Sequence, residues 1–160
     1  MQILGIDPGL NTTGYGVLRY EQNKMTLIEA GIIQPNRKDL LEHRLQKIYK
    51  GVEDVIDQYQ PDVLVLEKLY SHYRHPATVS VLGHVRGVIC LLCAQKKIEL
   101  IEHSPKRIRK SVTGTGNATK EQTQRMVAHL LKIDAGRLTL DASDALALAV
   151  GYTQMHRHQI

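Results

Sequence analysis

The order of strand and helix patterns constrains the fold of this chain more than any other feature. Three strand-like segments, residues 2–8, 14–20 and 25–33, follow one another with short connections. Short connections favour antiparallel pairing, so these segments predict a three-stranded meander. A Gly-Tyr-Gly turn is expected between the first two of them.

Helical and strand patterns alternate over the rest of the chain. Apolar residues recur at spacings of four and three from Asp39 to Tyr59, which predicts an amphipathic helix that ends before Pro61. The run DVLVLE, residues 62–67, predicts a fully buried strand. The remaining expected elements are a helix from Pro76 to about Lys97, a strand over 98–103, a basic helix after it, a helix over about 119–132 and a last helix from Asp141.

Strands that follow helices join a sheet in parallel fashion, so the last two strands should extend the meander in that way. The predicted architecture is α/β, with a mixed five-stranded sheet (three antiparallel strands, then two parallel ones) and helices on both faces. No linker, internal repeat or low-complexity tract divides the 160 residues. We therefore expect a single domain over residues 1–160.

The chain is basic, with a formal net charge of +5, which is compatible with a polyanionic partner. A solvated helix face explains a short basic run as well as phosphate contacts do. The candidate phosphate-binding residues lie in the run HSPKRIRK and shortly after it: Lys106, Arg107, Arg109, Lys110 and Lys120.

Targeting signals are missing from the sequence pattern. We identify no apolar run that approaches the length of a membrane span, and the N-terminus lacks a basic, then apolar, then small-residue signal. From these two observations we expect a cytoplasmic protein.

Four acidic residues occupy positions where a mixed sheet delivers side chains to a crevice. Asp7 ends the first strand and Glu67 ends the fourth, each after an apolar run, while Asp141 and Asp144 lie three residues apart at the start of the last helix. An N-cap role explains Asp141 more simply than chemistry does. That explanation does not account for Asp144, which occupies an inward-facing position.

An acidic crevice of this kind predicts a metal site. Four carboxylates would repel one another strongly, and a divalent cation would relieve the repulsion. An all-oxygen ligand set selects Mg²⁺ or Mn²⁺ over zinc. Two such ions can activate a water molecule and stabilise the departing oxygen of a phosphodiester. Together with the basic surface, this chemistry suggests a nuclease.

The motifs GIDPG with GYGV downstream, VLEK and DASDALALA resemble those of the RuvC-type Holliday junction resolvases, members of the ribonuclease H-like superfamily. The similarity covers nearly the whole chain in the same element order. It implies a ribonuclease H-like fold and four metal-binding, catalytic acids, which map onto Asp7, Glu67, Asp141 and Asp144. It also implies Mg²⁺ as the cofactor, whereas two ions in each active site, with Mn²⁺ as a substitute, are expected from the ligand chemistry above.

The resemblance further implies a substrate, a reaction and partners. Members of this family are homodimers that bind four-way DNA junctions in homologous recombination and repair. They nick two like strands symmetrically and leave a 5′-phosphate and a 3′-hydroxyl. The implied protein partner is a branch-migration motor of the RuvA and RuvB type.

Several secondary positions carry over from the family. Tyr70 matches an aromatic residue that stacks on an unpaired base at the crossover, although a tyrosine that anchors a loop fits as well. Lys120 matches a basic residue that contacts the scissile backbone. The family usually has a lysine where Arg109 falls, and Lys110 is adjacent, so either residue can take that role.

A glycine pair, Gly83 and Gly87, lies in the helix that forms the dimer interface in this family. Small residues four apart let another backbone approach closely, which favours helix pairing between subunits. Tight packing on the domain's own sheet is the alternative. Among the histidines, none has helical ligand spacing supported by acids or cysteines, so we expect them at the surface or facing DNA. The histidines in question are His72, His75, His84, His103, His156 and His158.

Three other functions compete with junction resolution. A ribonuclease H-like enzyme that cuts RNA, or the RNA of a hybrid, would use the same acids. The opening phrase also resembles the phosphate loop of actin-like ATPases, but those proteins need two such domains and this chain has room for one. A non-catalytic DNA-binding module is the third, and the presence of all four acids argues against it.

Overall fold

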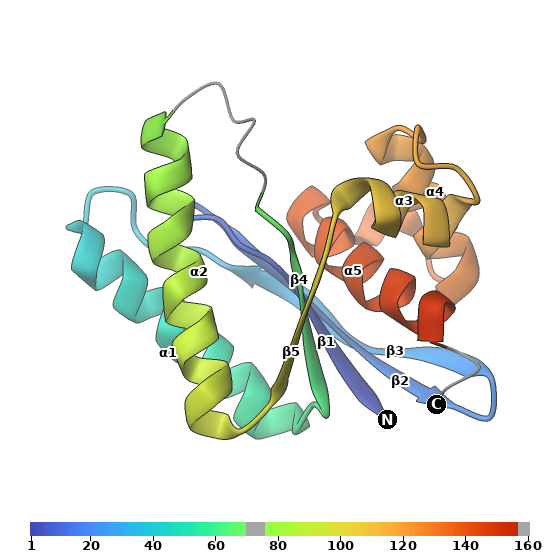
Figure 1. The fold of residues 1–160 in the computed structure, drawn as a ribbon, viewed down its shortest axis with the longest axis horizontal. Coiled ribbons are helices and arrows are strands. Elements are labelled where there is room, and N and C mark those ends of the chain that lie inside the picture. Colours follow the sequence, from blue (N-terminus) through green and yellow to red (C-terminus); the bar gives the residue numbers. More distant parts are fainter. Residues whose placement is uncertain (70–75, 157–160) are drawn as a thin grey trace.

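A single mixed sheet organises the computed structural model, which describes residues 1–69 and 76–156 (Figure 1). Along the chain its elements are β1 (Gln2–Asp7), β2 (Thr13–Glu21), β3 (Lys24–Ile33), α1 (Leu41–Tyr59), β4 (Val63–Glu67), α2 (Pro76–Lys96), β5 (Glu99–His103), α3 (Pro105–Thr113), α4 (Lys120–Leu131), a 3₁₀ turn (Ala135–Arg137) and α5 (Leu140–His156). The predicted element order is confirmed. Element ends differ from the prediction by one or two residues, and the 3₁₀ turn was not expected.

The sheet has the strand order β3-β2-β1-β4-β5. Strand β2 pairs antiparallel with both β1 and β3, while β4 pairs parallel with β1 and with β5. This is the predicted arrangement of three antiparallel strands followed by two parallel ones. Because β1, β4 and β5 are parallel neighbours, their carboxyl ends lie at one edge of the sheet.

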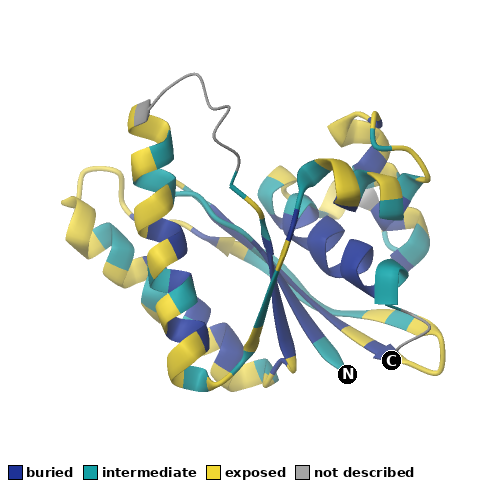
Figure 2. Ribbon diagram, in the orientation of Figure 1, coloured by how far each residue is buried: buried dark blue, intermediate teal, exposed yellow. Residues whose placement is uncertain are grey.

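Helices cover both faces of the sheet, as predicted. In Figure 1, α1 and α2 lie on one side and α3, α4 and α5 on the other. Strands β1 and β4 are central and dark blue in Figure 2, because helices shield them on both sides. A strand buried on both faces needs an unbroken apolar run, which explains the sequence VLVL in β4.

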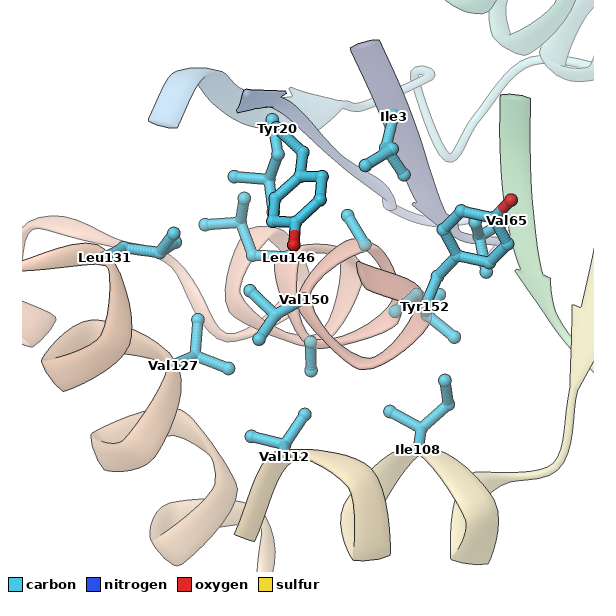
Figure 3. Close-up of a cluster of buried hydrophobic side chains, with 14 of the residues drawn as sticks. Ile3, Tyr20, Val65, Ile108, Val112, Val127, Leu131, Leu146, Val150 and Tyr152 are labelled. Atoms are coloured by element: carbon cyan, nitrogen blue, oxygen red, sulfur yellow. The ribbon is translucent and has the colours of Figure 1, made fainter. Parts of the chain in front are cut away.

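Helix α5 forms the centre of one core. Its residues from Ala142 to Thr153 are buried almost without interruption, except for Asp144. An apolar surface on all sides of a helix is typical of one surrounded by other elements. In Figure 3, Leu146 and Val150 of α5 lie between Ile3 of the sheet and Val112 of α3.

Two glycines allow α5 to lie directly on the sheet. A Cβ atom on Gly5 would lie 2.1 Å from the Ala145 carbonyl oxygen, and one on Gly14 would lie 2.0 Å from the Asp141 carbonyl oxygen. The expected Gly-Tyr-Gly turn is wrong, because Gly14 and Gly16 lie inside β2. These glycines are needed for the close approach of a helix and not for a change of chain direction.

The expectation of no membrane-length apolar segment also needs correction. Within residues 1–69 and 76–156, one helix is long and apolar enough to cross a membrane by length and composition, α2 over Ala77–Lys96. Two glycines and one arginine interrupt the apolar residues of this helix, so its sequence contains no unbroken apolar run of that length. Length and composition alone are weak evidence for a span, because core helices pass the same test.

Candidate active site

Strand alternation turns the two strand-end acids toward the same face of the sheet. Ile3 of β1 and Val65 of β4 both pack in the α5 core, so Asp7 and Glu67, at even spacing from them, project to that face too. The pairing of β1 with β4 runs as far as Ile6 and Leu66, one residue before the acids. Neighbouring parallel strands therefore place Asp7 and Glu67 side by side at their carboxyl ends.

Helix α5 brings the other two acids to this edge. The Ala142 N–H donates to Thr139 Oγ1 at 3.3 Å, so Thr139 caps the helix and Asp141 lies within its first turn. The N-cap interpretation of Asp141 is therefore wrong. Asp144 follows three residues later, beside buried Ala145.

Three of the four acids share one open cavity of about 380 Å³. Carboxylates from β1, β4 and α5 meet there with cations from α3 and α4. The lining residues are Asp7, Glu67, Pro105, Ile108, Arg109, Lys120, Thr123, Asp144, Ala147 and Leu148. Below, this cavity is called the acidic pocket.

Asp141 lies beside the acidic pocket and lines a neighbouring groove. That groove has a volume of about 520 Å³ and runs between residues 9–12 and the start of α2. Asp141 still acts on the pocket through its charge, because it is among the groups that raise the pKa of Asp7.

Burial and crowding of negative charge change the protonation of Asp7. Burial, then the charges of Asp144 and Glu67, raise its pKa from 3.8 to about 7, against the opposing effect of Lys120. A pKa raised this far means that the surroundings of Asp7 stabilise its ionised form less than water does. This imbalance is what an added cation would relieve.

Glu67 shows a smaller imbalance of the same kind. Burial raises its pKa, and Asp144 adds to that effect. Three cations lower the pKa in opposition: Lys120, Arg109 and Arg86. Glu67 therefore lies in a more evenly balanced field than Asp7.

Lys120 is the cation in closest contact with the acids. Its Nζ lies 2.6 Å from Asp144 Oδ2, and this hydrogen bond is the main cause of the raised pKa of Lys120. Thr119 caps α4 in a capping box, which fixes the start of the helix and with it the position of Lys120.

The carboxylates fit a hard cation by chemistry but do not form a finished coordination shell. Across residues 1–69 and 76–156, no three His, Cys, Asp or Glu side chains are placed closely enough to hold one metal ion. Oxygen-only donors, a shared cavity and the raised pKa of Asp7 suit Mg²⁺. Ligation would therefore require the acids to move closer together.

The predicted basic residues occupy different positions. Arg109 lines the acidic pocket with Lys120, whereas Lys110, its neighbour in sequence, is exposed outside that lining. Arg107 donates from Nε to Met155 Sδ at 3.2 Å, and the Lys106 side chain passes close to Gly116. Geometry thus favours Arg109 over Lys110 as the cation beside the acids.

Tyr70, His72, His75 and His158 lie outside the described residues. His103 contradicts the expectation of surface or DNA-facing histidines. It is 8% exposed, and its ring lies 6.4 Å from that of Tyr152. Its position at the end of β5 directs it into the space beside α5, where burial is the main cause of its lowered pKa.

Gly83 and Gly87 face open space. A Cβ atom added to either one would meet nothing within 4 Å. Packing on the domain's own sheet therefore does not explain this pair, and the alternative interpretation is wrong.

Sequence reasoning missed Arg86, whose guanidinium contacts the main chain of Glu67. The available signal was a lone arginine within an otherwise apolar helix, GHVRGVICLL. A charged residue in that setting needs a partner, and its partners lie on two strands distant in sequence.

Comparison with known proteins gives consistent similarities. A family model described as "Crossover junction endodeoxyribonuclease RuvC" matches residues 3–152. The protein of that name from Rhodopirellula baltica is 42% identical over 148 residues, which cover 92% of this chain and 83% of the relative. The one from Alkaliphilus metalliredigens is 39% identical over 150 residues, covering 94% and 91%.

Solved structures agree in fold. Thermus thermophilus RuvC in complex with a Holliday junction substrate superposes with a TM-score of 0.89 at 21% identity, over 99% of this chain and 96% of that one. The yeast mitochondrial Holliday junction resolvase Ydc2 gives a TM-score of 0.72 at 14% identity, over 97% and 78%. The predicted mixed five-stranded sheet with helices on both faces is thus a fold shared with these resolvases.

Proposed function

This chain belongs to the RuvC family of crossover junction endodeoxyribonucleases, and we propose that it resolves four-way DNA junctions at the acidic pocket. The reaction is phosphodiester hydrolysis that leaves a 5′-phosphate and a 3′-hydroxyl. The paired, symmetric nicks belong to homologous recombination and repair.

The observation that carries the proposal is the shared pocket of Asp7, Glu67 and Asp144, with Lys120 and Arg109 at its side. Acids alone would repel a phosphodiester, and cations alone would bind DNA without cutting it. Their juxtaposition in one open cavity supports binding of a phosphate next to groups that hold a metal ion.

Asp7, Glu67, Asp141 and Asp144 are the proposed Mg²⁺ ligands and catalytic residues. When bound, two Mg²⁺ ions, or Mn²⁺ in their place, supply activation of the attacking water and stabilisation of the leaving oxygen. The raised pKa of Asp7 supports this assignment, since the pocket lacks enough positive charge of its own.

The cations of the pocket bind the DNA backbone in this proposal. Lys120 and Arg109 lie closest to the acids and contact the phosphates that flank the scissile bond. The other basic residues of α3 extend this surface away from the pocket: Lys106, Arg107 and Lys110. Tyr70 keeps its proposed role of stacking on an unpaired base.

Homodimer formation through α2 is the proposed quaternary arrangement. Exposed residues at spacings of three and four place one stripe on the outer side of this helix. The stripe consists of Ser80, Gly83, Gly87, Leu91 and Ala94, with Leu91 55% exposed. Open space above both glycines supports close pairing with a second helix. Two pockets on one dimer would then cut symmetrically related strands.

Partnership with a branch-migration motor of the RuvA and RuvB type, and a location in the cytoplasm, are proposed on family membership alone.

Cleavage of defined substrates tests the proposal. The wild type should nick a synthetic four-way junction in two symmetric strands, only with Mg²⁺ or Mn²⁺, and leave linear duplex and RNA–DNA hybrid intact. Glu67→Gln should lose cleavage, while Asp134→Asn, an exposed acid outside the pocket, should keep it. Cleavage of the hybrid alone would replace this proposal with the ribonuclease alternative.

A further inference from the structure

Arg86 links α2 to the strand that carries Glu67. It is 8% exposed, although it lies on a helix whose outer side faces open space. Its guanidinium donates from Nη1 to the Glu67 carbonyl oxygen and from Nη2 to a Glu102 carboxylate oxygen. One side chain thus bridges the carboxyl ends of β4 and β5.

The end of β4 needs a donor from outside the sheet. The pairing of β1 with β4 stops at Ile6 and Leu66. Just beyond Asp7, the chain continues with Pro8, which has no N–H and cannot extend a ladder of hydrogen bonds. The Glu67 carbonyl receives its hydrogen bond from Arg86 instead.

The far side of this strand end is tied to β5. The Lys68 N–H donates to the His103 carbonyl oxygen at 2.8 Å. Glu102, the residue before His103, accepts from Arg86. The main chain around Glu67 is therefore held on one side by the hydrogen bond between Lys68 and His103 and on the other by Arg86, which also reaches β5 through Glu102.

Arg86 also borders the active site in space. A small cavity of about 40 Å³ is lined by Asp7, Pro8, Glu67 and Arg86, with Lys68, Leu69 and Leu82. This cavity lies on the α2 side of the two strand-end acids. The guanidinium is therefore adjacent to the acids without lying in the acidic pocket.

We propose that Arg86 is a positioning residue, which orients the Glu67 carboxylate by holding the Glu67 main chain against β5. The inference rests on the proposed role of Glu67 as a metal ligand. A planar guanidinium can donate to a carbonyl and a carboxylate at once, whereas a lysine ammonium at the same position reaches them as a single point charge. Residues that orient ligands typically change activity by about 10- to 100-fold when removed.

A purely structural role is the competing explanation, and Lys96 provides the matched control. Lys96 lies on the same helix and makes ion pairs with Glu53 and Asp57 of α1. These ion pairs hold α2 to α1 and involve neither β4 nor the acids of the active site. Loss of α2 anchoring in general should therefore affect Arg86→Met and Lys96→Met alike.

The experiment compares Arg86→Met, Arg86→Lys, Glu102→Gln and Lys96→Met with the wild type. Three quantities are measured: the junction dissociation constant in chelator, the single-turnover cleavage rate in Mg²⁺, and hydrogen exchange of the Lys68 amide without metal. Arg86→Met should cleave about 10- to 100-fold more slowly, with a dissociation constant within about twofold of the wild type. Its Lys68 amide should exchange faster, and Arg86→Lys should recover part of both losses.

Cleavage by Arg86→Met within about twofold of the wild type, or an equal loss in Lys96→Met, would overturn the inference. Should Arg86→Met fail to fold, Glu102→Gln tests the same clamp with a smaller change, and wild-type exchange at Lys68 would then overturn it. A wild type that cuts no junction would refute the proposed function instead, and the Lys68 exchange would still decide whether Arg86 holds the strand end.

Discussion

Lys120 Nζ lies 2.6 Å from Asp144 Oδ2, which joins the first residue of α4 to the acid in the first turns of α5. The Lys120 side chain is 75% exposed and that of Asp144 is 23% exposed, so a largely solvent-exposed cation pairs with a partly buried carboxylate. The carboxylate of Asp144 is also a proposed metal ligand. Lys120 and a bound metal ion would therefore each neutralise part of the negative charge of the pocket. The negative charge of a bound phosphate would offset the positive charge that remains.

Removal of the Lys120 charge should slow cleavage and shift its pH dependence. Lys120 lowers the pKa of both Asp7 and Glu67, so Lys120→Met should raise both values further. The rising, acidic limb of the pH–rate profile should move to higher pH, and the rate should fall about 10- to 100-fold. Single-turnover cleavage of a junction measured between about pH 6 and pH 9 tests both effects, because the Asp7 pKa of about 7 lies in that range.

Lys24→Met is the matched control for this prediction. Lys24 is exposed on β3 and lies outside the acidic pocket. An unchanged profile in Lys120→Met, or an equal shift in Lys24→Met, would show that the ion pair with Asp144 does not govern the acids.

Asp7 should destabilise the metal-free protein at neutral pH. Its folded pKa of about 7 lies above the ordinary value of 3.8, so the native state holds the proton more tightly than the unfolded state does. The free energy of unfolding should therefore fall as pH rises through that window. At pH 8, Asp7→Asn should be more stable than the wild type by about 2–4 kcal/mol, and the difference should vanish near pH 3.

Urea unfolding in chelator at several pH values tests this sign. Added Mg²⁺ should then stabilise the wild type more than Asp7→Asn, because ligation compensates the buried charge. A less stable Asp7→Asn at pH 8 would mean that Asp7 is already satisfied within the protein.

Removal of a pocket acid should separate cutting from binding. Asp7→Asn and Asp144→Asn should lower the cleavage rate by about 100- to 1,000-fold or more, because several kcal/mol of transition-state stabilisation disappear with the metal site. Junction affinity should be retained or increased, since each change removes a negative charge near the DNA phosphates. Gel-shift and cleavage assays on the same protein samples measure the two quantities. Retained cleavage in both variants would mean that the site is assigned wrongly.

The local sequence pattern predicted the features that depend on the spacing of apolar residues and on the order of strands and helices along the chain. Apolar runs in β1 and β4 placed Asp7 and Glu67 at strand ends, where a mixed sheet delivers side chains to a crevice. Asp141 and Asp144 were found because three-residue spacing defines a helix face. The cap at Thr139 was missed because helix ends depend on side-chain hydrogen bonds that pattern alone does not specify.

Contacts between segments that are distant in sequence could not be predicted from the local pattern. The role of Gly14 depends on α5, which follows more than a hundred residues later. Arg86 has hydrogen-bond partners on β4 and β5, and the buried His103 ring lies near Tyr152 of α5. Such residues reveal their function only once the sheet order brings their neighbours together.

The glycines of α2 offer a test with opposite signs for helix stability and self-association. Because a Cβ at Gly87 meets nothing within 4 Å, Gly87→Ala should stabilise the helix by about 0.5–1 kcal/mol. Gly87→Glu should fold equally well but weaken dimer formation, since a charged side chain would lie between two closely paired helices. Unfolding in denaturant and sedimentation equilibrium measure the two effects. An unchanged association constant in Gly87→Glu would exclude this face as the interface.

An added methyl group at Gly14 should destabilise the protein, because the position of its Cβ is already occupied by the main chain of α5. A Cβ at Gly14 would lie 2.0 Å from the Asp141 carbonyl oxygen, a backbone atom that cannot move without α5. Gly14→Ala should therefore lower the free energy of unfolding by about 1–3 kcal/mol. Displacement of α5 would also carry Asp141 and Asp144 away from Asp7, so cleavage should fall more than junction binding. Denaturant unfolding and single-turnover cleavage check both expectations. An active, fully stable Gly14→Ala would show that the acids do not require this close contact between helix and sheet.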